Sequence, residues 1–170
     1  RIATEAWGFP KVGFEPKKGQ LCVAIAISNP AYLREAIERV RDLFDARLNP
    51  HAHLHDVDGG DAAGAFYRDH LGIRIPGAWD PFETAVCIIL GQLVTVEQAR
   101  IKVKKLVARF GTKIARPVFA ECAYLFPGPN TIARANLRHL GITKARGSAL
   151  RELSRRVLEH HLAGRPPMRL

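Results

Sequence analysis

Two helix-start signals, separated by a very short link, constrain the middle of this sequence most strongly. Residues 80–83 read Asp-Pro-Phe-Glu, which is an N-cap residue, a proline at the first helical position and a glutamate placed for a capping box. Thr95 and Gln98 repeat the spacing of cap and box. Only Gly91–Val94 remains to join the two helices. We therefore predict two consecutive helices connected by a tight turn.

The remainder of the C-terminal half also shows helical apolar stripes. Gly111 and Gly141 are typical residues at helix C-termini. The predicted helices cover residues 95–110, 130–140 and 143–162, with Asn130 or Thr131 as the N-cap of the second and Thr143 as that of the third. This half is therefore mainly α-helical.

The N-terminal part predicts a small antiparallel sheet followed by a helix. Residues 11–15 and 21–27 are short strands around a turn at 16–19, because small and larger apolar residues alternate along the second strand. Two strands alone are marginal in water, so either residues 1–10 add a strand or part of the sheet lies before Arg1. Asn29-Pro30 starts a helix that ends at Asn49-Pro50, and a short helix covers 62–70. The predicted fold class is α+β, with a partial α+β domain over 1–57 and a helical domain over 58–170.

Composition excludes several classes of protein. Apolar residues make up 47% and charged residues 25%, which indicates a globular core and not a disordered chain. No apolar run approaches the ~20 residues of a membrane span, and no signal peptide is visible. The three cysteines, Cys22, Cys87 and Cys122, are isolated, which predicts buried thiols and a reducing, cytoplasmic location. Because the chain begins at Arg1 and not at Met, we expect a fragment of a longer protein.

Charge is strongly segregated along the chain. Residues 1–99 hold 10 Lys and Arg against 13 Asp and Glu, a net charge of −3. Residues 100–170 hold 16 against 3, a net charge of +13. Such segregation predicts a polyanionic partner more strongly than the total of +10 does. The alternative is a solvated basic surface that only maintains solubility.

Motifs for metal-dependent or nucleophilic catalysis are weak or missing. His51, His53 and His55 would share one side of a strand, but the surrounding Pro, Gly and Asp favour an exposed loop, so we predict no metal site. The sequence holds no nucleophile elbow, phosphate-binding glycine loop or HExxH motif. We predict no cofactor, and we find no carboxylate pair with a catalytic setting.

The turn Gly91–Val94 is the segment with functional character. An apolar residue at a short interhelical link, beside an amide and ahead of a basic helix, suits insertion into a DNA base stack. Leu93 would fill the gap left by an extruded nucleotide, and Gln92 would hydrogen-bond the exposed base edges. The alternative is that Leu93 belongs to the core.

Residues 72–83, Gly-Ile-Arg-Ile-Pro-Gly-Ala-Trp-Asp-Pro-Phe-Glu, and 89–96, Ile-Leu-Gly-Gln-Leu-Val-Thr-Val, resemble a known family. So do 125–129, Leu-Phe-Pro-Gly-Pro, and 140–143, Leu-Gly-Ile-Thr, with Arg146 following. Over roughly residues 12–165 the chain resembles DNA-3-methyladenine glycosylase II, the alkylation-repair branch of the helix-hairpin-helix DNA glycosylases. The resemblance implies a DNA repair enzyme that flips alkylated bases out of duplex DNA and hydrolyses their N-glycosidic bond, which starts base excision repair.

The family's apolar wedge falls on Gln92 and Leu93. The predicted DNA-binding residues are Gln92, Leu93, Val94, Lys102, Lys105, Lys144 and Arg146. The resemblance implies an aromatic base pocket, for which Trp7, Phe9, Trp79 and Tyr124 are candidates, although packing explains each as well. The expected partner is duplex DNA with alkylated bases, and no membrane partner is expected. The protein is expected to act as a monomer and, in a bacterium, to associate with the nucleoid.

The sequence departs from the family pattern at its end. The hairpin reading Leu-Pro-Gly-Ile-Gly and the catalytic Asp beyond it are expected after Leu170, so the catalytic residue is not assigned. Two alternatives stay open for this reason. One is a non-catalytic DNA-binding module that kept the glycosylase fold, and the other is an RNA-associated helical domain.

Overall fold

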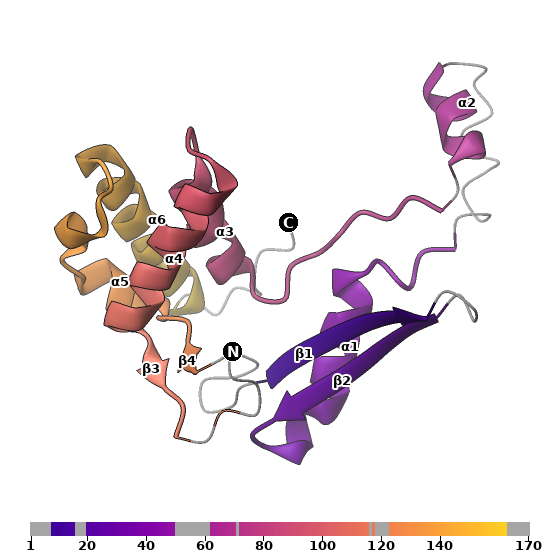
Figure 1. Cartoon of the computed structure of the whole chain (residues 1–170), viewed down its shortest axis with the longest axis horizontal. Coiled ribbons are helices and arrows are strands. Elements are labelled where there is room, and N and C mark those ends of the chain that lie inside the picture. Colours follow the sequence, from indigo (N-terminus) through magenta and orange to yellow (C-terminus); the bar gives the residue numbers. More distant parts are fainter. Residues whose placement is uncertain are drawn as a thin grey trace. The chain divides into compact units, whose positions relative to one another are not determined.

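The computed structural model describes residues 8–15, 20–49, 62–70, 72–115, 117 and 123–162. The fold is α+β, as predicted, with short antiparallel strand pairs and a larger helical part (Figure 1). The chain divides into two compact units, one over Ala31–Trp79 and the other over Arg1–Pro30 together with Asp80–Leu170. The predicted domain boundary between residues 57 and 58 lies outside the described residues.

The N-terminal strands form a hairpin. β1 (Gly8–Glu15) pairs antiparallel with β2 (Gln20–Ile27), and Val12 lies opposite Val23. β1 begins earlier than predicted, because residues 8–10 continue the ladder opposite Ile25–Ile27. Cys22 is exposed on β2, so the prediction that this thiol is buried was wrong. The alternation of side chains along a strand places Cys22 on the face opposite to that of Val23.

The described residues of the unit over Ala31–Trp79 form α1 (Leu33–Leu43), which follows the 3-10 turn η1 (Pro30–Tyr32), and α2 (Ala62–Asp69). The prediction that α1 continues to Asn49 was wrong. Asp45 adopts a left-handed φ of 49°, and the Ala46 N–H donates to the Arg41 carbonyl at 2.8 Å. This Schellman arrangement ends the helix before the loop.

A glycine from later in the sequence packs against the end of α1. The Gly77 N–H donates to the Leu43 carbonyl at 3.1 Å. A Cβ at Gly77 would lie 2.5 Å from the Asp42 carbonyl oxygen, so a side chain does not fit there. Arg39 on α1 also donates to the Trp79 carbonyl at 3.0 Å.

The helical part contains α3 (Pro81–Gly91), α4 (Val96–Phe110), α5 (Pro129–Arg134), the 3-10 helix η3 (Leu137–Leu140) and α6 (Lys144–Leu162) (Figure 1). α3 packs on α4 and α6, and α5 packs on α6. Their apolar stripes meet in one core that includes Val86, Leu90, Leu106, Ile132, Leu137, Leu140 and Leu150. The pair of helices joined by a tight turn is therefore confirmed.

The caps of these helices follow the sequence with one exception. Asp80 Oδ1 accepts from the Glu83 N–H at 3.0 Å, and Thr95 and Thr143 cap α4 and α6 in the same way. The predicted cap at Asn130 or Thr131 was wrong, because Gly128 is the N-cap and Pro129 is the first residue of α5.

The segment predicted as one helix over 130–140 is two shorter elements. α5 ends at Arg134, and the Asn136 side chain then accepts from the Arg138 N–H at 3.3 Å to start η3. An asparagine that binds its own neighbouring backbone competes with a continuous helix. Gly141 ends η3 with a left-handed φ of 65°, as predicted.

A two-residue strand pair follows α4. β3 (Thr112–Lys113) pairs with β4 (Tyr124–Leu125). A Cβ at Gly111 would lie 2.4 Å from the Val107 carbonyl oxygen and 2.6 Å from that of Leu125, so glycine is required between α4 and β3. In the part of the chain that the structure describes, no helix is both long and apolar enough to cross a membrane.

Candidate nucleic-acid interface

The turn between α3 and α4 presents a leucine almost wholly to solvent. The Leu93 side chain is 98% exposed, and its φ of 54° lies in the left-handed region. That conformation costs a non-glycine residue roughly 1–2 kcal/mol. Leu93 is therefore not a core residue, and its burial requires a partner molecule.

The residues on either side hold this turn in place. Gln92 is the C-cap of α3, and Val94 is half-buried. Thr95 Oγ1 accepts from the Gln98 N–H at 3.2 Å and starts α4. Leu93 thus lies between the C-cap residue of α3 and the N-cap residue of α4, the second of which makes a side-chain capping hydrogen bond.

A side chain from α6 reaches the same turn. The Arg146 guanidinium donates to the Gln92 carbonyl across 54 positions of sequence. Arg146 is in the first turn of α6, where Thr143 Oγ1 accepts from its backbone N–H at 3.3 Å. The structure therefore brings Arg146 together with Gln92 and links the turn to α6.

The predicted lysines are less closely grouped. Lys144 is exposed as the first residue of α6. Lys102 is half-buried on α4, whereas Lys105 is exposed one turn later. Lys105 lies ten residues beyond Thr95, which is about 15 Å along the helix axis.

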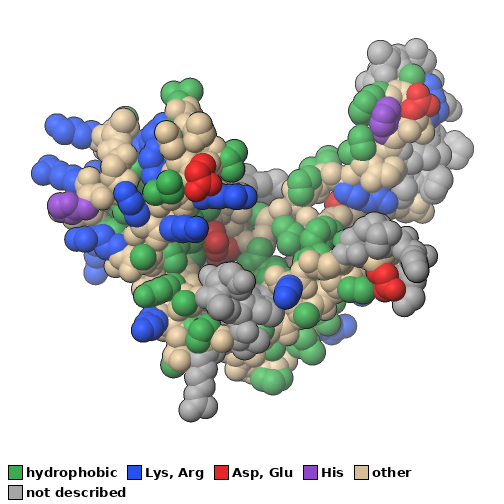
Figure 2. Space-filling model, viewed as in Figure 1, with side chains coloured by type: hydrophobic (Ala, Val, Ile, Leu, Met, Phe, Trp, Pro, Cys, Tyr) green, Lys and Arg blue, Asp and Glu red, His purple; other side chains and the backbone are tan. Residues whose placement is uncertain are grey.

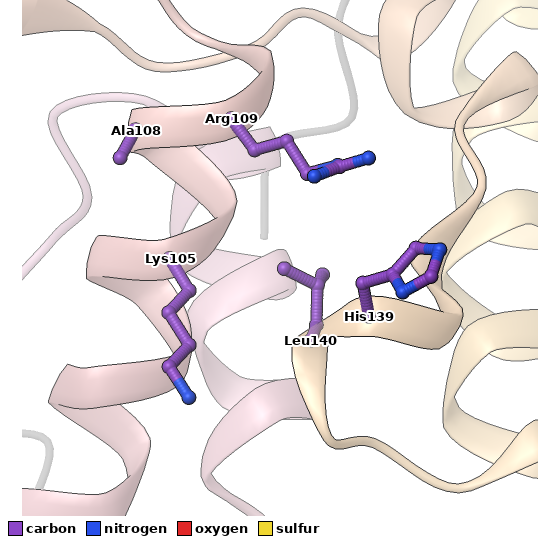
Figure 3. A pocket seen from close by; sticks show the side chains of 5 residues that line it. All are labelled: Lys105, Ala108, Arg109, His139 and Leu140. Carbon is purple, nitrogen blue, oxygen red and sulfur yellow. The ribbon is translucent and has the colours of Figure 1, made fainter.

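Lys105 contributes to a groove between α4 and η3 (Figure 3). Its lining residues, which we call the cationic groove, are Lys105, Ala108, Arg109, His139 and Leu140, and its volume is about 350 Å³. Figure 3 shows Arg109 extending from α4 toward the side of His139, with Leu140 between the two elements. Leu140 is buried and belongs to the core, so the groove has an apolar floor.

Arg109 and His139 were not among the predicted site residues. The spacing of Lys105 and Arg109, four residues apart on one helix, was a signal that they share a face. No sequence pattern connects His139 with them, because η3 meets α4 only in the folded chain.

Basic side chains gather on the helical part of the molecule (Figure 2). Arg155 and Arg156 are paired with Glu152 at 2.5 and 2.9 Å, and these pairings lower the Glu152 pKa. Among the residues that the structure describes, no carboxylate pairs with Lys105 or Arg109.

The acidic residues at the start of α3 have a structural setting. Burial, and then the charge of Asp80, raise the pKa of Glu83. Burial, and then the charge of Glu83, raise the pKa of the Cys87 thiol to about 11. Cys87 is therefore protonated at neutral pH and is a poor nucleophile. A cavity of about 160 Å³ beside Asp80 is lined by Phe82, Phe126, Pro127, Gly128, Pro129 and Val157.

The other candidate residues belong to different parts of the sequence. Trp79 is half-buried with its carbonyl bound by Arg39, and Tyr124 is exposed on β4. Phe9 lies in β1. Trp7 lies outside the described residues, as do Cys122 and the histidines at 51, 53 and 55. No group of three or more metal-ligating side chains occurs within the described ranges.

Comparison with known proteins shows which family the chain resembles. Residues 2–80 match the sequence model of the AlkA N-terminal domain. DNA-3-methyladenine glycosylase 2 of Escherichia coli (strain K12) is 33% identical over 128 residues, which are 74% of this chain and 42% of that protein. The chain resembles the DNA-3-methyladenine glycosylase II family. It spans less than half the length of this curated glycosylase relative.

Solved glycosylase structures share the fold. A 3-methyladenine DNA-glycosylase from Archaeoglobus fulgidus matches with a TM-score of 0.58 at 19% identity, over 89% of this chain and 56% of that one. An 8-oxoguanine glycosylase/lyase from Clostridium acetobutylicum, in complex with double-stranded DNA, matches with a TM-score of 0.55 at 14% identity, over 89% and 53%. At these identities the likeness establishes the glycosylase fold alone.

Proposed function

We propose that this chain is the duplex-binding part of a DNA repair glycosylase that acts on alkylated bases of the 3-methyladenine type. The observation that carries the proposal is the exposure of Leu93 at the tip of the α3–α4 turn. A monomer would insert this side chain into the base stack from the minor groove. Partial unstacking costs a few kcal/mol, which contacts to the bent duplex repay.

The neighbours of Leu93 suit that role. The Gln92 side chain is exposed beside the leucine and carries amide donors and acceptors for base edges. The Arg146 guanidinium donates to the Gln92 carbonyl, so it stabilises the position of the turn while Leu93 enters the base stack. Exposed Lys144 supplies positive charge for the phosphate backbone.

The proposed reaction is hydrolysis of the N-glycosidic bond. Water adds its hydroxide part to C1′ of the sugar as the bond between C1′ and the base nitrogen breaks, and the electron pair leaves with the base. An alkylated purine already carries a positive charge, so it departs neutral. The remaining water proton passes to solvent. We assign the catalytic role to no described residue.

The support from relatives is specific to DNA. The curated relative is a DNA-3-methyladenine glycosylase, and its match extends over 74% of this chain. The net charge of +13 over residues 100–170 suits a polyanion. The relative favours duplex DNA over an RNA partner, whereas the charge suits either nucleic acid.

Incubation of the purified chain with methylated duplex DNA tests the proposal. A form that continues through any further sequence encoded by the gene is assayed in parallel. We expect tighter binding to damaged than to undamaged duplex, and release of 3-methyladenine by the longer form, measured by chromatography. Binding without base release by either form would support the non-catalytic module. Preference for single-stranded RNA over duplex would overturn the proposal.

A further inference from the structure

We propose that the cationic groove binds backbone phosphates of duplex DNA in one arm of the duplex, several base pairs from the base displaced at Leu93. This inference rests on the proposed function and adds a second contact region to it. The groove is formed by Lys105 and Arg109 on α4 and by His139 on η3 (Figure 3).

The charge of the groove is not neutralised within the described chain. Lys105 and Arg109 lie four residues apart on one helical face, where like charges repel. By contrast, Arg155 and Arg156 are paired with Glu152. No described carboxylate offsets the repulsion between these two cations. An anion bound in the groove would offset it.

The shape of the groove favours a nucleic acid backbone. Arg and Lys side chains recognise phosphate oxygens. Ala108 and Leu140 provide an apolar floor against which a deoxyribose can lie. The groove is wide open to solvent, so a sugar–phosphate segment can lie across it.

The position of the groove on α4 sets its distance from the wedge. Lys105 and Arg109 lie ten and fourteen residues beyond Thr95, which is about 15 and about 21 Å along the helix. At a rise of ~3.4 Å per base pair, that span corresponds to about four to six base pairs. A duplex that bends around the protein at Leu93 then brings one arm alongside α4.

The test compares two duplexes that carry the same central abasic-site analogue. One has about ten base pairs on each side. The other has about three, closed at each end by an uncharged polyether linker, so its phosphates are too few to reach the groove at ~3.4 Å per base pair. The variant is Lys105→Gln with Arg109→Gln, and both side chains are exposed, so folding is retained. Arg155→Gln with Arg156→Gln is the control, because it removes the same formal charge from residues already paired with Glu152.

On the long duplex we expect the groove variant to bind roughly 10-fold more weakly at ~0.1 M salt, with a log–log salt slope shallower by about 1.8 for two lost phosphate contacts. On the short duplex it should bind as the wild-type chain does, and the control should match wild type on both. Equal losses on both duplexes, or an unchanged slope on the long one, would overturn the inference alone. If the wild-type chain binds neither duplex, the proposed function fails and the inference fails with it.

Discussion

Replacing Leu93 with alanine should leave the free energy of unfolding unchanged. Its side chain is 98% exposed, so only the remaining 2% of a burial contribution of ~1.5–3 kcal/mol is lost, which is below ~0.1 kcal/mol. Alanine also keeps the left-handed backbone conformation and its cost. Leu106→Ala is the contrasting variant, because Leu106 is fully buried and its truncation costs about 2–5 kcal/mol.

The same replacement should weaken binding to duplex DNA that contains a damaged or abasic position. We expect a loss of roughly 1–3 kcal/mol, the scale of unstacking one base step. That loss corresponds to a 5- to 150-fold rise in Kd, at about 1.4 kcal/mol for each factor of ten. Ile88→Ala is the binding control, because Ile88 is a 60% exposed apolar side chain that lies within α3 and not in the turn.

Two measurements on each variant decide the matter. Urea denaturation gives the free energy of unfolding, and fluorescence anisotropy at one fixed salt concentration gives Kd. A loss of more than ~2 kcal/mol in stability, on the scale of a core truncation, with unchanged Kd would refute the assignment of Leu93 as a wedge. Leu93→Gly adds a check on the turn. It should relieve a strain of about 1–2 kcal/mol, partly offset by greater freedom of the unfolded chain, and still bind weakly.

Three further outcomes are expected. Arg146→Ala should raise the Kd for duplex DNA about 10-fold, on the scale of a charged hydrogen bond, without changing the salt slope, because the guanidinium holds the Gln92 carbonyl; a shallower slope would mean that it binds phosphate. Gly111→Ala should lower the Tm and cost about 1–3 kcal/mol, since the new Cβ would meet the Val107 carbonyl oxygen at 2.4 Å; an unchanged Tm would contradict this. Glu83→Gln should stabilise the protein at neutral pH, because burial raises the folded-state pKa of Glu83, so its ionisation opposes folding. Stability of the wild-type chain should accordingly fall as pH rises above 4.5 through that pKa, with a smaller fall in the variant, as measured by urea denaturation across pH.

Local signals in the sequence were sufficient to predict the two helices, α3 and α4, whose connecting turn contains Leu93. Each N-cap on α3 and α4 is a side chain that binds a backbone N–H three residues ahead, so the cap is encoded within a few positions. The short link between them therefore followed from the sequence. The segregation of charge likewise needed no structure, because it depends only on the order of residues along the chain.

Contacts between distant segments were decided only by the tertiary structure. α1 ends at Leu43 because Asp45 turns left-handed and Gly77 packs against the helix end, 34 positions from Leu43. The join between Arg146 and Gln92 depends on how α6 packs on α3, and the cationic groove depends on how η3 meets α4. Periodicity and capping describe neighbours along the chain, whereas these contacts arise from the burial of apolar stripes on separate helices, which have many alternative pairings until the whole core packs.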